Sequence, residues 1–193
     1  MKENKTWKYT LAYSAKECAF IGVFVATLIA AQFILSALPG VEVVTVLFIA
    51  YSFTFGVRRG MISATAFALL RQLIFGFFST VLIVYLLYYN IIAATFGMLG
   101  KRIQNSVKRL WIIVIAACVC SIGFTLLDDI ITPWLLGYSA KAWQLYVYAS
   151  LPIMGVQVAT VAVTVSLLFL PLQRAFARIA RISHVKARKE QSR

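Results

Sequence analysis

Residues 81–127 read VLIVYLLYYNIIAATFGMLGKRIQNSVKRLWIIVIAACVCSIGFTLL, and this stretch decides the fold class. Two apolar runs, 81–99 and 110–127, flank a short basic segment that holds Lys101, Arg102, Lys108 and Arg109. Each run approaches the roughly 20 residues that an α-helix needs to cross a bilayer. Basic residues that flank spans stay on the cytoplasmic side. The stretch therefore predicts two membrane-spanning helices joined by a cytoplasmic loop.

The other basic residues repeat this arrangement along the chain. All of the 19 lysines and arginines except Arg71 and Lys141 fall in four clusters, at 2–16, 58–59, 101–109 and 174–193. Two apolar runs separate each neighbouring pair of clusters, which predicts an all-α membrane protein with six transmembrane helices and both termini cytoplasmic. Residues 1–172 form the predicted membrane domain, and residues 173–193 form a basic cytoplasmic amphipathic tail. The predicted spans are 18–38, 43–57, 61–75, 81–99, 110–127 and 151–172, with residues 128–150 outside.

Composition agrees with a membrane protein. The chain is 62% hydrophobic and 13% charged, and its mean hydropathy is +0.87, which a soluble domain of this size cannot accommodate. A net charge of +13 would suggest nucleic acid in a soluble protein. Here the charge lies at membrane edges, so we expect no nucleic-acid partner. The tail is expected to lie on the anionic lipid of the inner leaflet, with docking onto a cytoplasmic partner as the alternative.

Catalytic motifs are missing from the sequence. The only histidine is His184 in the tail, and there is no HExxH, GxSxG or phosphate-binding glycine loop. The six acidic residues form no metal-ligand set within a span. We therefore expect that the protein is not an enzyme, and that it holds no cofactor and no metal.

Arg71 is the polar residue that most needs an explanation. It lies about eleven residues into the third predicted span, where a charge costs about 2.5–3.5 kcal/mol on insertion scales. We expect it to pair with Glu42, Asp128 or Asp129, or to face a wet cavity. One interpretation is a structural pair that fixes helix packing. The other is an anchor for a ligand carboxylate, phosphate or amide in an outward-facing pocket.

Aromatic and polar residues surround the predicted outer ends of the spans. Tyr85, Tyr88 and Tyr89 share one helix face by their spacing. The aromatic residues of 128–150 form either an interfacial belt or the lining of a binding site. An aromatic pocket with a few convergent polar groups suits a vitamin-sized molecule. The candidate substrate-binding residues are Glu42, Arg71, Gln72, Tyr85, Tyr89, Asn90, Asp128, Asp129, Trp134 and Gln157.

Small residues recur along the first predicted span. Ala15, Ala19, Gly22, Ala26 and Ala30 step by three or four residues and so share one helix face. Such a face allows close approach of another helix, either inside this protein or on a partner. A similar line occurs in the last span, at Gly155, Ala159, Ala162 and Ser166.

The chain resembles the substrate-binding S components of energy-coupling factor (ECF) vitamin transporters. The resemblance rests on the six-span plan, on the small-residue face, and on the segments PGVEVVTVLF at 39–48 and FGVRRG at 55–60. The resemblance covers about residues 15–172, and it lies in the pattern of spans and residue types more than in residue-by-residue sequence similarity.

The resemblance implies a function. An S component in a prokaryotic plasma membrane binds a vitamin on the outer side. It then docks onto a transmembrane T component with two cytoplasmic ATPase subunits, and topples to deliver the ligand. The family's docking motif would fall on Ala15, Ala19 and Gly22, or on Gly22, Ala26 and Ala30.

The substrate remains open at this point. The lack of an N-terminal histidine argues against nickel and cobalt, and the Glu42 region and the aromatic outer segment favour a large vitamin such as cobalamin over the other vitamin branches. The competing interpretation is a structural membrane scaffold that binds no small molecule.

Overall fold

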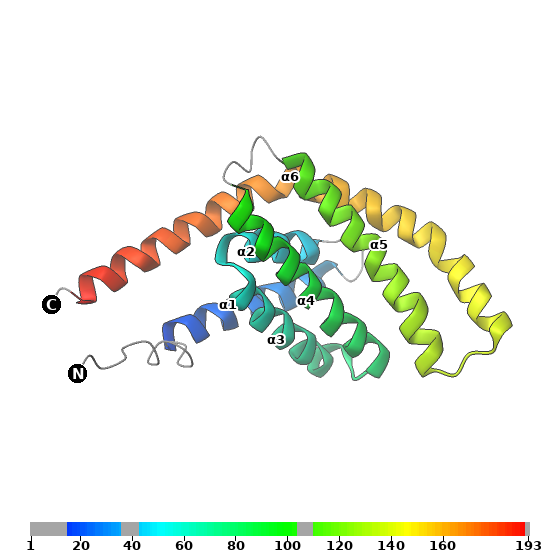
Figure 1. Cartoon of the computed structure of the whole chain (residues 1–193). Helices are drawn as coiled ribbons and strands as arrows, with labels where there is room; N and C mark the ends of the chain where they lie inside the picture. Colours follow the sequence, from blue (N-terminus) through cyan, green and yellow to red (C-terminus); the bar gives the residue numbers. More distant parts are fainter. Residues whose placement is uncertain (1–14, 36–42, 104–109, 192–193) are drawn as a thin grey trace, which may run out of the picture.

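The protein is a helical assembly in the computed structural model, which describes residues 15–35, 43–103 and 110–191. Figure 1 shows α1 to α4 gathered into one body, with the α5–α6 hairpin leaning away from it. The predicted number of helices is confirmed. The helices are α1 (Ala15–Leu35), α2 (Val43–Phe55), α3 (Val57–Phe75), α4 (Ser79–Arg102), α5 (Leu110–Leu135) and α6 (Ala140–Gln191).

The helices differ in their ability to span a membrane. Four of those described, α1, α4, α5 and α6, are long and apolar enough to cross one. In contrast, α2 has only 13 residues, about 20 Å at 1.5 Å per residue, against about 30 Å of hydrocarbon. The remaining helix, α3, carries Arg58, Arg59 and Arg71. These features fit a transmembrane protein, while the six-span count and the orientation of the termini stay predictions.

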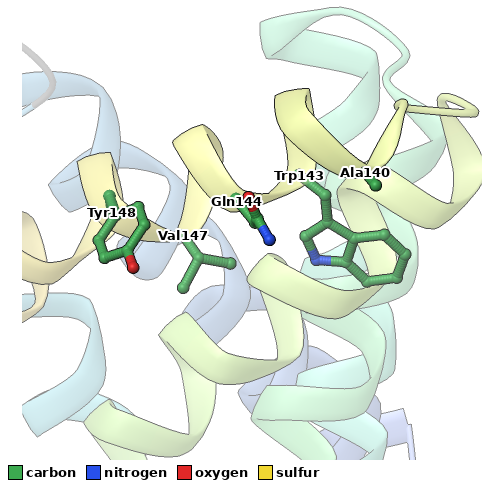
Figure 2. A pocket seen from close by; sticks show the side chains of 5 residues that line it. All are labelled: Ala140, Trp143, Gln144, Val147 and Tyr148. Carbon is green, nitrogen blue, oxygen red and sulfur yellow. The ribbon is translucent and has the colours of Figure 1, made fainter.

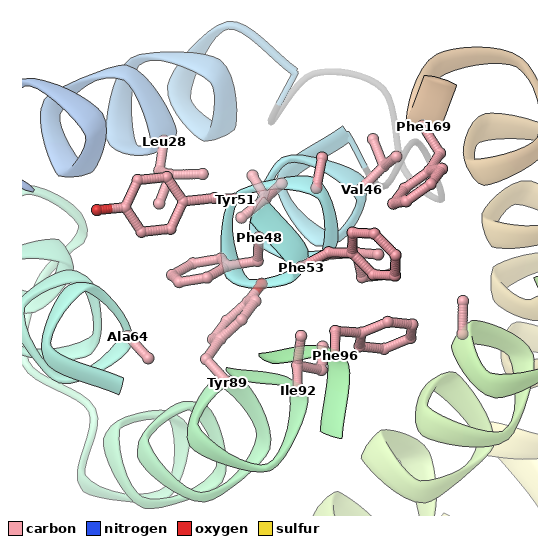
Figure 3. Close-up of a cluster of buried hydrophobic side chains, with 14 of the residues drawn as sticks. Leu28, Val46, Phe48, Tyr51, Phe53, Ala64, Tyr89, Ile92, Phe96 and Phe169 are labelled. Carbon is pink, nitrogen blue, oxygen red and sulfur yellow. The ribbon is translucent and has the colours of Figure 1, made fainter. Parts of the chain in front are cut away.

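The short helix α2 forms the centre of the body and packs against α1, α3, α4 and α6. The Tyr51 ring stacks on Phe24 of α1 with centroids 3.8 Å apart, and Phe48 stacks on Tyr89 of α4 at 4.6 Å. Figure 3 shows Phe48, Tyr51 and Tyr89 among the buried side chains around α2. Because lipid is as apolar as the side chains, close contact between such rings, rather than hydrophobic force, holds membrane helices together.

Two glycines bring α4 against the junction between α2 and α3. A Cβ added to Gly100 would overlap the carbonyl oxygen of Phe53, and one added to Gly97 would lie 2.5 Å from the backbone nitrogen of Val57. At the junction itself, Gly56 has a φ of +85°, a conformation that residues with a Cβ rarely adopt. The body therefore depends on backbone contacts that no larger residue permits.

Residues 128–150, which were predicted to lie outside the spans, form the turn of the α5–α6 hairpin and the helix on each side of it. Helix α5 continues to Leu135 and α6 begins at Ala140. Gly137, with a φ of +65°, ends α5. The Tyr138 amide donates to the Pro133 carbonyl at 3.0 Å and the Gly137 amide to that of Trp134 at 3.4 Å, which is a Schellman cap. The apolar residues between Asp129 and Gly137 sustain the helix up to this cap.

Helix α6 has 52 residues and would be about 78 Å long if straight, far more than a bilayer requires. Figure 1 shows it bent: its yellow half runs beside α5, and its orange-to-red half projects from the body. Pro171 lies inside the helix, and proline is a common cause of helix kinks. The helix crosses the predicted boundary at 172/173 without a break, and Phe176 packs on Phe24 and Tyr51 with centroids 5.9 Å apart in both pairs.

Candidate functional site

Arg71 lies where α1, α3 and α4 meet. Its Nε donates to Oε1 of Gln32 on α1 at 3.0 Å, and Nε2 of Gln32 donates to the Tyr85 hydroxyl of α4 at 3.2 Å. The guanidinium carbon lies 4.5 Å from the ring centroid of Tyr85 and 4.9 Å from that of Phe75. We call Gln32, Arg71, Phe75 and Tyr85 the Arg71 cluster.

The cluster stabilises the arginine but, within the described residues, accepts a hydrogen bond from only one of its five N–H groups. A guanidinium has five N–H donors, and within the described residues only the one on Nε donates to an acceptor. The rings of Phe75 and Tyr85 contribute about 0.5–2 kcal/mol each by cation–π attraction. Arg71 is also only four residues from Phe75, the last residue of α3, where the helix dipole favours a positive charge. Within the described residues, the two terminal nitrogens therefore have no acceptor.

Two of the three predicted acidic partners of Arg71, Asp128 and Asp129, do not pair with it. Within the described residues, Arg71 forms no ion pair, and an amide oxygen and two rings take the place of a carboxylate. Glu42, one of the three predicted partners, lies outside the described residues. Asp128 and Asp129 bind residues of α5 and α6 instead. The prediction was wrong for these two because sequence position gave their depth but not the face of α5 that they occupy.

Polar residues form a line along the contact between α5 and α6. Ser121, Thr125 and Asp129 are buried at intervals of four residues on α5. The Thr125 hydroxyl donates to Oε1 of Gln157 on α6 at 3.0 Å, and the Ser150 hydroxyl of α6 donates to Oδ2 of Asp129 at 2.8 Å. We call Thr125, Asp128, Asp129, Tyr146, Ser150 and Gln157 the α5–α6 seam.

Asp128 and Asp129 are held differently within the seam. Asp128 accepts hydrogen bonds from the hydroxyls of Thr132 and Tyr146, both at 2.7 Å. Asp129 is only 5% exposed, and its Oδ1 has no partner among the described residues. Asp128, Asp129 and Gln157 are predicted substrate-binding residues, and Tyr146 is one of the aromatic residues predicted to form a belt or a binding site. Thr125 and Ser150 were not among the candidates. The spacing of Ser121, Thr125 and Asp129, one polar residue per helical turn, is the sequence signal that could have identified this polar line.

Phe124 connects the two regions. Its ring centroid lies 6.0 Å from that of Tyr85 and 4.7 Å from that of Tyr88, so α5 contacts the tyrosine face of α4 one residue before Thr125. The Arg71 cluster and the seam are thus neighbours across the α4–α5 contact.

Four predicted residues lie elsewhere. Tyr89 is a core residue, 5% exposed, between Phe48 and Phe67. Gln72 is buried, and its Oε1 accepts from the Phe78 amide at 3.1 Å, which orders the turn before α4. Asn90 bonds Thr65 on the α3 side of α4. Trp134 is 71% exposed. The structure therefore does not bring these four side chains to Arg71.

A hollow of about 450 Å³ lies along the start of α6 and is lined by Ala140, Trp143, Gln144, Val147 and Tyr148. Figure 2 shows the side chains of Trp143, Gln144 and Val147 extending from one side of the helix. Its volume is within the range of ligand pockets, and its mostly apolar lining is typical of them. Two of the aromatic residues predicted to form a belt or a binding site thus line a concave surface.

The small-residue face of α1 points away from the rest of the protein. Ala15 begins the helix, and Ala19, Gly22, Ala26 and Ala30 are exposed. A Cβ added to Gly22 would have no atom within 4 Å. Internal packing, one of the two interpretations of this face, does not occur among the described residues. The equivalent positions Gly155, Ala159 and Ser166 on α6 are exposed as well.

No protein-family model, curated protein or solved structure matches the chain. Within the described residues, no group of three or more His, Cys, Asp or Glu side chains is placed to hold a metal ion. The candidate site is therefore defined by the Arg71 cluster, with the seam beside it.

Proposed function

We propose that the protein is the substrate-binding S component of an ECF-type importer for a vitamin or a related micronutrient. The observation that supports this most is the state of Arg71, which is fixed by Gln32 and two rings while its terminal nitrogens have no partner among the described residues. A fixed, partly desolvated guanidinium binds a carboxylate, phosphate or carbonyl oxygen with two-pronged geometry.

The ligand class follows from the surroundings of that guanidinium. Tyr85 carries both a ring beside Arg71 and a hydroxyl that bonds Gln32. Such a site suits a molecule with a planar ring and an oxygen acceptor, a description that several vitamins meet. A cobalamin-like ligand remains our preferred candidate because residues 128–150 are rich in aromatic side chains.

Transport would require partners, because the sequence contains no phosphate-binding loop for ATP. We propose that the exposed small residues of α1 dock onto a transmembrane T component that works with two cytoplasmic ATPase subunits. Small residues permit the close helix contacts that drive association in lipid. Toppling of the S component would then move the ligand from the outer to the inner side.

The second candidate is a membrane scaffold without a small-molecule ligand. Its support is that the amide and the two rings already stabilise Arg71, so that a purely structural role is physically sufficient. The exposed small-residue lines on both α1 and α6 would then serve two protein partners.

Native mass spectrometry of the purified protein distinguishes the two candidates. The S-component proposal predicts a co-purified small molecule, or a mass shift when cobalamin, riboflavin, thiamine, biotin, folate or pantothenate is added. Loss of that mass shift in an Arg71→Ala variant that remains folded would assign the ligand to the cluster. A protein that binds none of these molecules and carries none from the cell would favour the scaffold.

A further inference from the structure

Three exposed basic residues lie at one end of the α3–α4 hairpin. Arg58 is in the first turn of α3, and Lys101 and Arg102 are the last two residues of α4. The start of α3 and the end of α4 are in contact, because a Cβ added to Gly97 would lie 2.5 Å from the backbone nitrogen of Val57. Residues that are distant in the sequence thus bring their positive charges to the same end of the hairpin.

This end of the hairpin has a net positive charge. Within the described residues, the ion pair found here joins Arg59 of α3 to Glu17 of α1, so that the one carboxylate in contact is already used by a fourth cation. Positive charge is also unfavourable in the first turn of a helix, which is where Arg58 and Arg59 lie. An anion bound beside Arg58 would therefore relieve repulsion among the basic residues.

An apolar groove leads from these basic residues along the hairpin. It has a volume of about 380 Å³ and is lined by Met61 of α3 and by Leu86, Leu87, Asn90, Ile91 and Ala94 of α4.

Helical spacing connects the groove to the cations. On α3, Met61 lies three residues after Arg58, and on α4, Ala94 lies seven residues before Lys101, so each pair shares one helix face. Between Ala94 and Lys101 on that face, Met98 is exposed. The groove and the basic end of the hairpin therefore form one continuous surface, which is apolar along its length and positively charged at one end.

The position of this surface indicates which molecule it fits. Helix α4 is long and apolar enough to cross a membrane, so that Lys101 and Arg102 at its end would lie level with the lipid headgroups. An anionic phospholipid carries its phosphate at that level and extends its acyl chains along the helices. A free phosphate would use the cations but not the groove.

A second copy of the chain fits this surface poorly. In the same orientation, it would bring its own three cations to the same level, and like charges facing each other across an interface repel.

We infer that the α3–α4 hairpin binds an anionic phospholipid, whose phosphate contacts Arg58, Lys101 and Arg102 and whose acyl chain lies in the groove. The inference is independent of the proposed function, because it uses neither the Arg71 cluster nor the small-residue face of α1. It also differs from the lipid contact expected of the tail, since it uses no residue of 173–193.

Native mass spectrometry of the full chain with added lipids tests the charge requirement. The probes are phosphatidylglycerol and phosphatidylcholine with the same acyl chains. We expect phosphatidylglycerol to bind more tightly, by about fivefold for each cation that contacts its phosphate. Arg58→Gln should weaken phosphatidylglycerol binding by about fivefold and leave phosphatidylcholine binding unchanged. The matched control is Arg174→Gln, an exposed arginine of α6 that does not line the groove, and it should leave both affinities unchanged.

A second variant tests the groove. Ala94→Phe fills the groove and keeps all three cations, so it should weaken phosphatidylglycerol binding while the protein remains monodisperse. Unchanged binding by Ala94→Phe, or displacement of the lipid by inorganic phosphate, would overturn the inference, because the cations would then serve a free phosphate or an acidic protein. Equal losses for Arg58→Gln and Arg174→Gln would also overturn it, because the lipid would then respond only to the net charge of the chain.

Discussion

The body of α1 to α4 and the α5–α6 hairpin are held together by different chemistry. In the body, aromatic rings stack around α2 and glycines admit backbone contacts, so that Phe48 and Tyr51 are fully buried. In the hairpin, hydroxyl, carboxyl and amide groups pair between α5 and α6. The outward faces of these helices are exposed, as at Trp134 and Leu145, while Phe169 of α6 packs against Phe53 of α2. Arg71 of the body lies close to the boundary between the two regions, because Tyr85, which contacts its guanidinium, also contacts Phe124 of α5.

The largest effect should come from the glycine at the tightest contact of the body. Gly100→Ala places a Cβ against the Phe53 carbonyl oxygen, and because backbone cannot move aside as a flexible side chain can, we expect about 3 kcal/mol of destabilisation, the upper part of the range for overpacking. The loss is measured as the change in the free energy of unfolding in detergent micelles. If the destabilisation is larger, the variant should fail to yield a monodisperse protein.

The hairpin provides the matched control for this substitution. Gly123 of α5 has open space around its Cβ position, so Gly123→Ala should leave stability unchanged or raise it by about 0.5–1 kcal/mol through helix propensity. Equal destabilisation by the two substitutions would show that the body and the hairpin do not differ in packing.

A smaller effect is expected at the seam. Tyr146→Phe removes the hydroxyl that donates to Oδ2 of Asp128 but keeps the ring, which contacts Tyr138. Because hydrogen bonds between membrane helices contribute about 0.6–1.7 kcal/mol, we expect a loss of about 1 kcal/mol in the free energy of unfolding. Tyr148→Phe, at a residue that is 71% exposed, is the control and should leave stability unchanged. If both substitutions change the free energy of unfolding equally, the hydrogen bond between Tyr146 and Asp128 does not stabilise the α5–α6 seam.

The smallest effect on stability should occur at the α1 face. Ala26→Leu adds bulk at an exposed position, so the isolated protein should change by less than about 0.5 kcal/mol. Uptake and co-purification with a T component should nevertheless fall, because the larger side chain separates two helices. Ala159→Leu on the exposed line of α6 should leave co-purification intact. If only Ala159→Leu reduces co-purification with the T component, the docking face lies on α6 and not on α1.

The sequence predicted the helices well because bilayer thickness and basic clusters act on every span in the same way. Helices α2, α3 and α4 begin and end within a few residues of the predicted runs. The predicted fifth span ends at Leu127, whereas helix α5 continues through Asp128 and Asp129 to Leu135. In the structure, both acids are satisfied by hydroxyls of α5 and α6.

The site was harder to predict because it depends on which helices are neighbours. Arg71 could be identified from depth alone, but its partner Gln32 lies 39 residues earlier on α1 and has no distinguishing pattern. The tyrosines of α4 share one face in the sequence, yet only Tyr85 contacts Arg71, while Tyr89 packs in the core. The depth of a residue in its helix can be estimated from the nearby sequence. Which helices lie next to each other depends on the packing of the whole body.

The binding affinity of Arg71 variants tests the central claim most directly. With the vitamin identified by native mass spectrometry, equilibrium titration should show that Arg71→Ala weakens binding by about 1.5–3 kcal/mol, the contribution of a charged hydrogen bond, or roughly ten- to over a hundredfold. Arg71→Lys should recover only part of this, since lysine keeps the charge but loses the planar geometry. An Arg71→Ala variant that binds with wild-type affinity and is merely less stable would contradict the account and leave Arg71 as a packing residue.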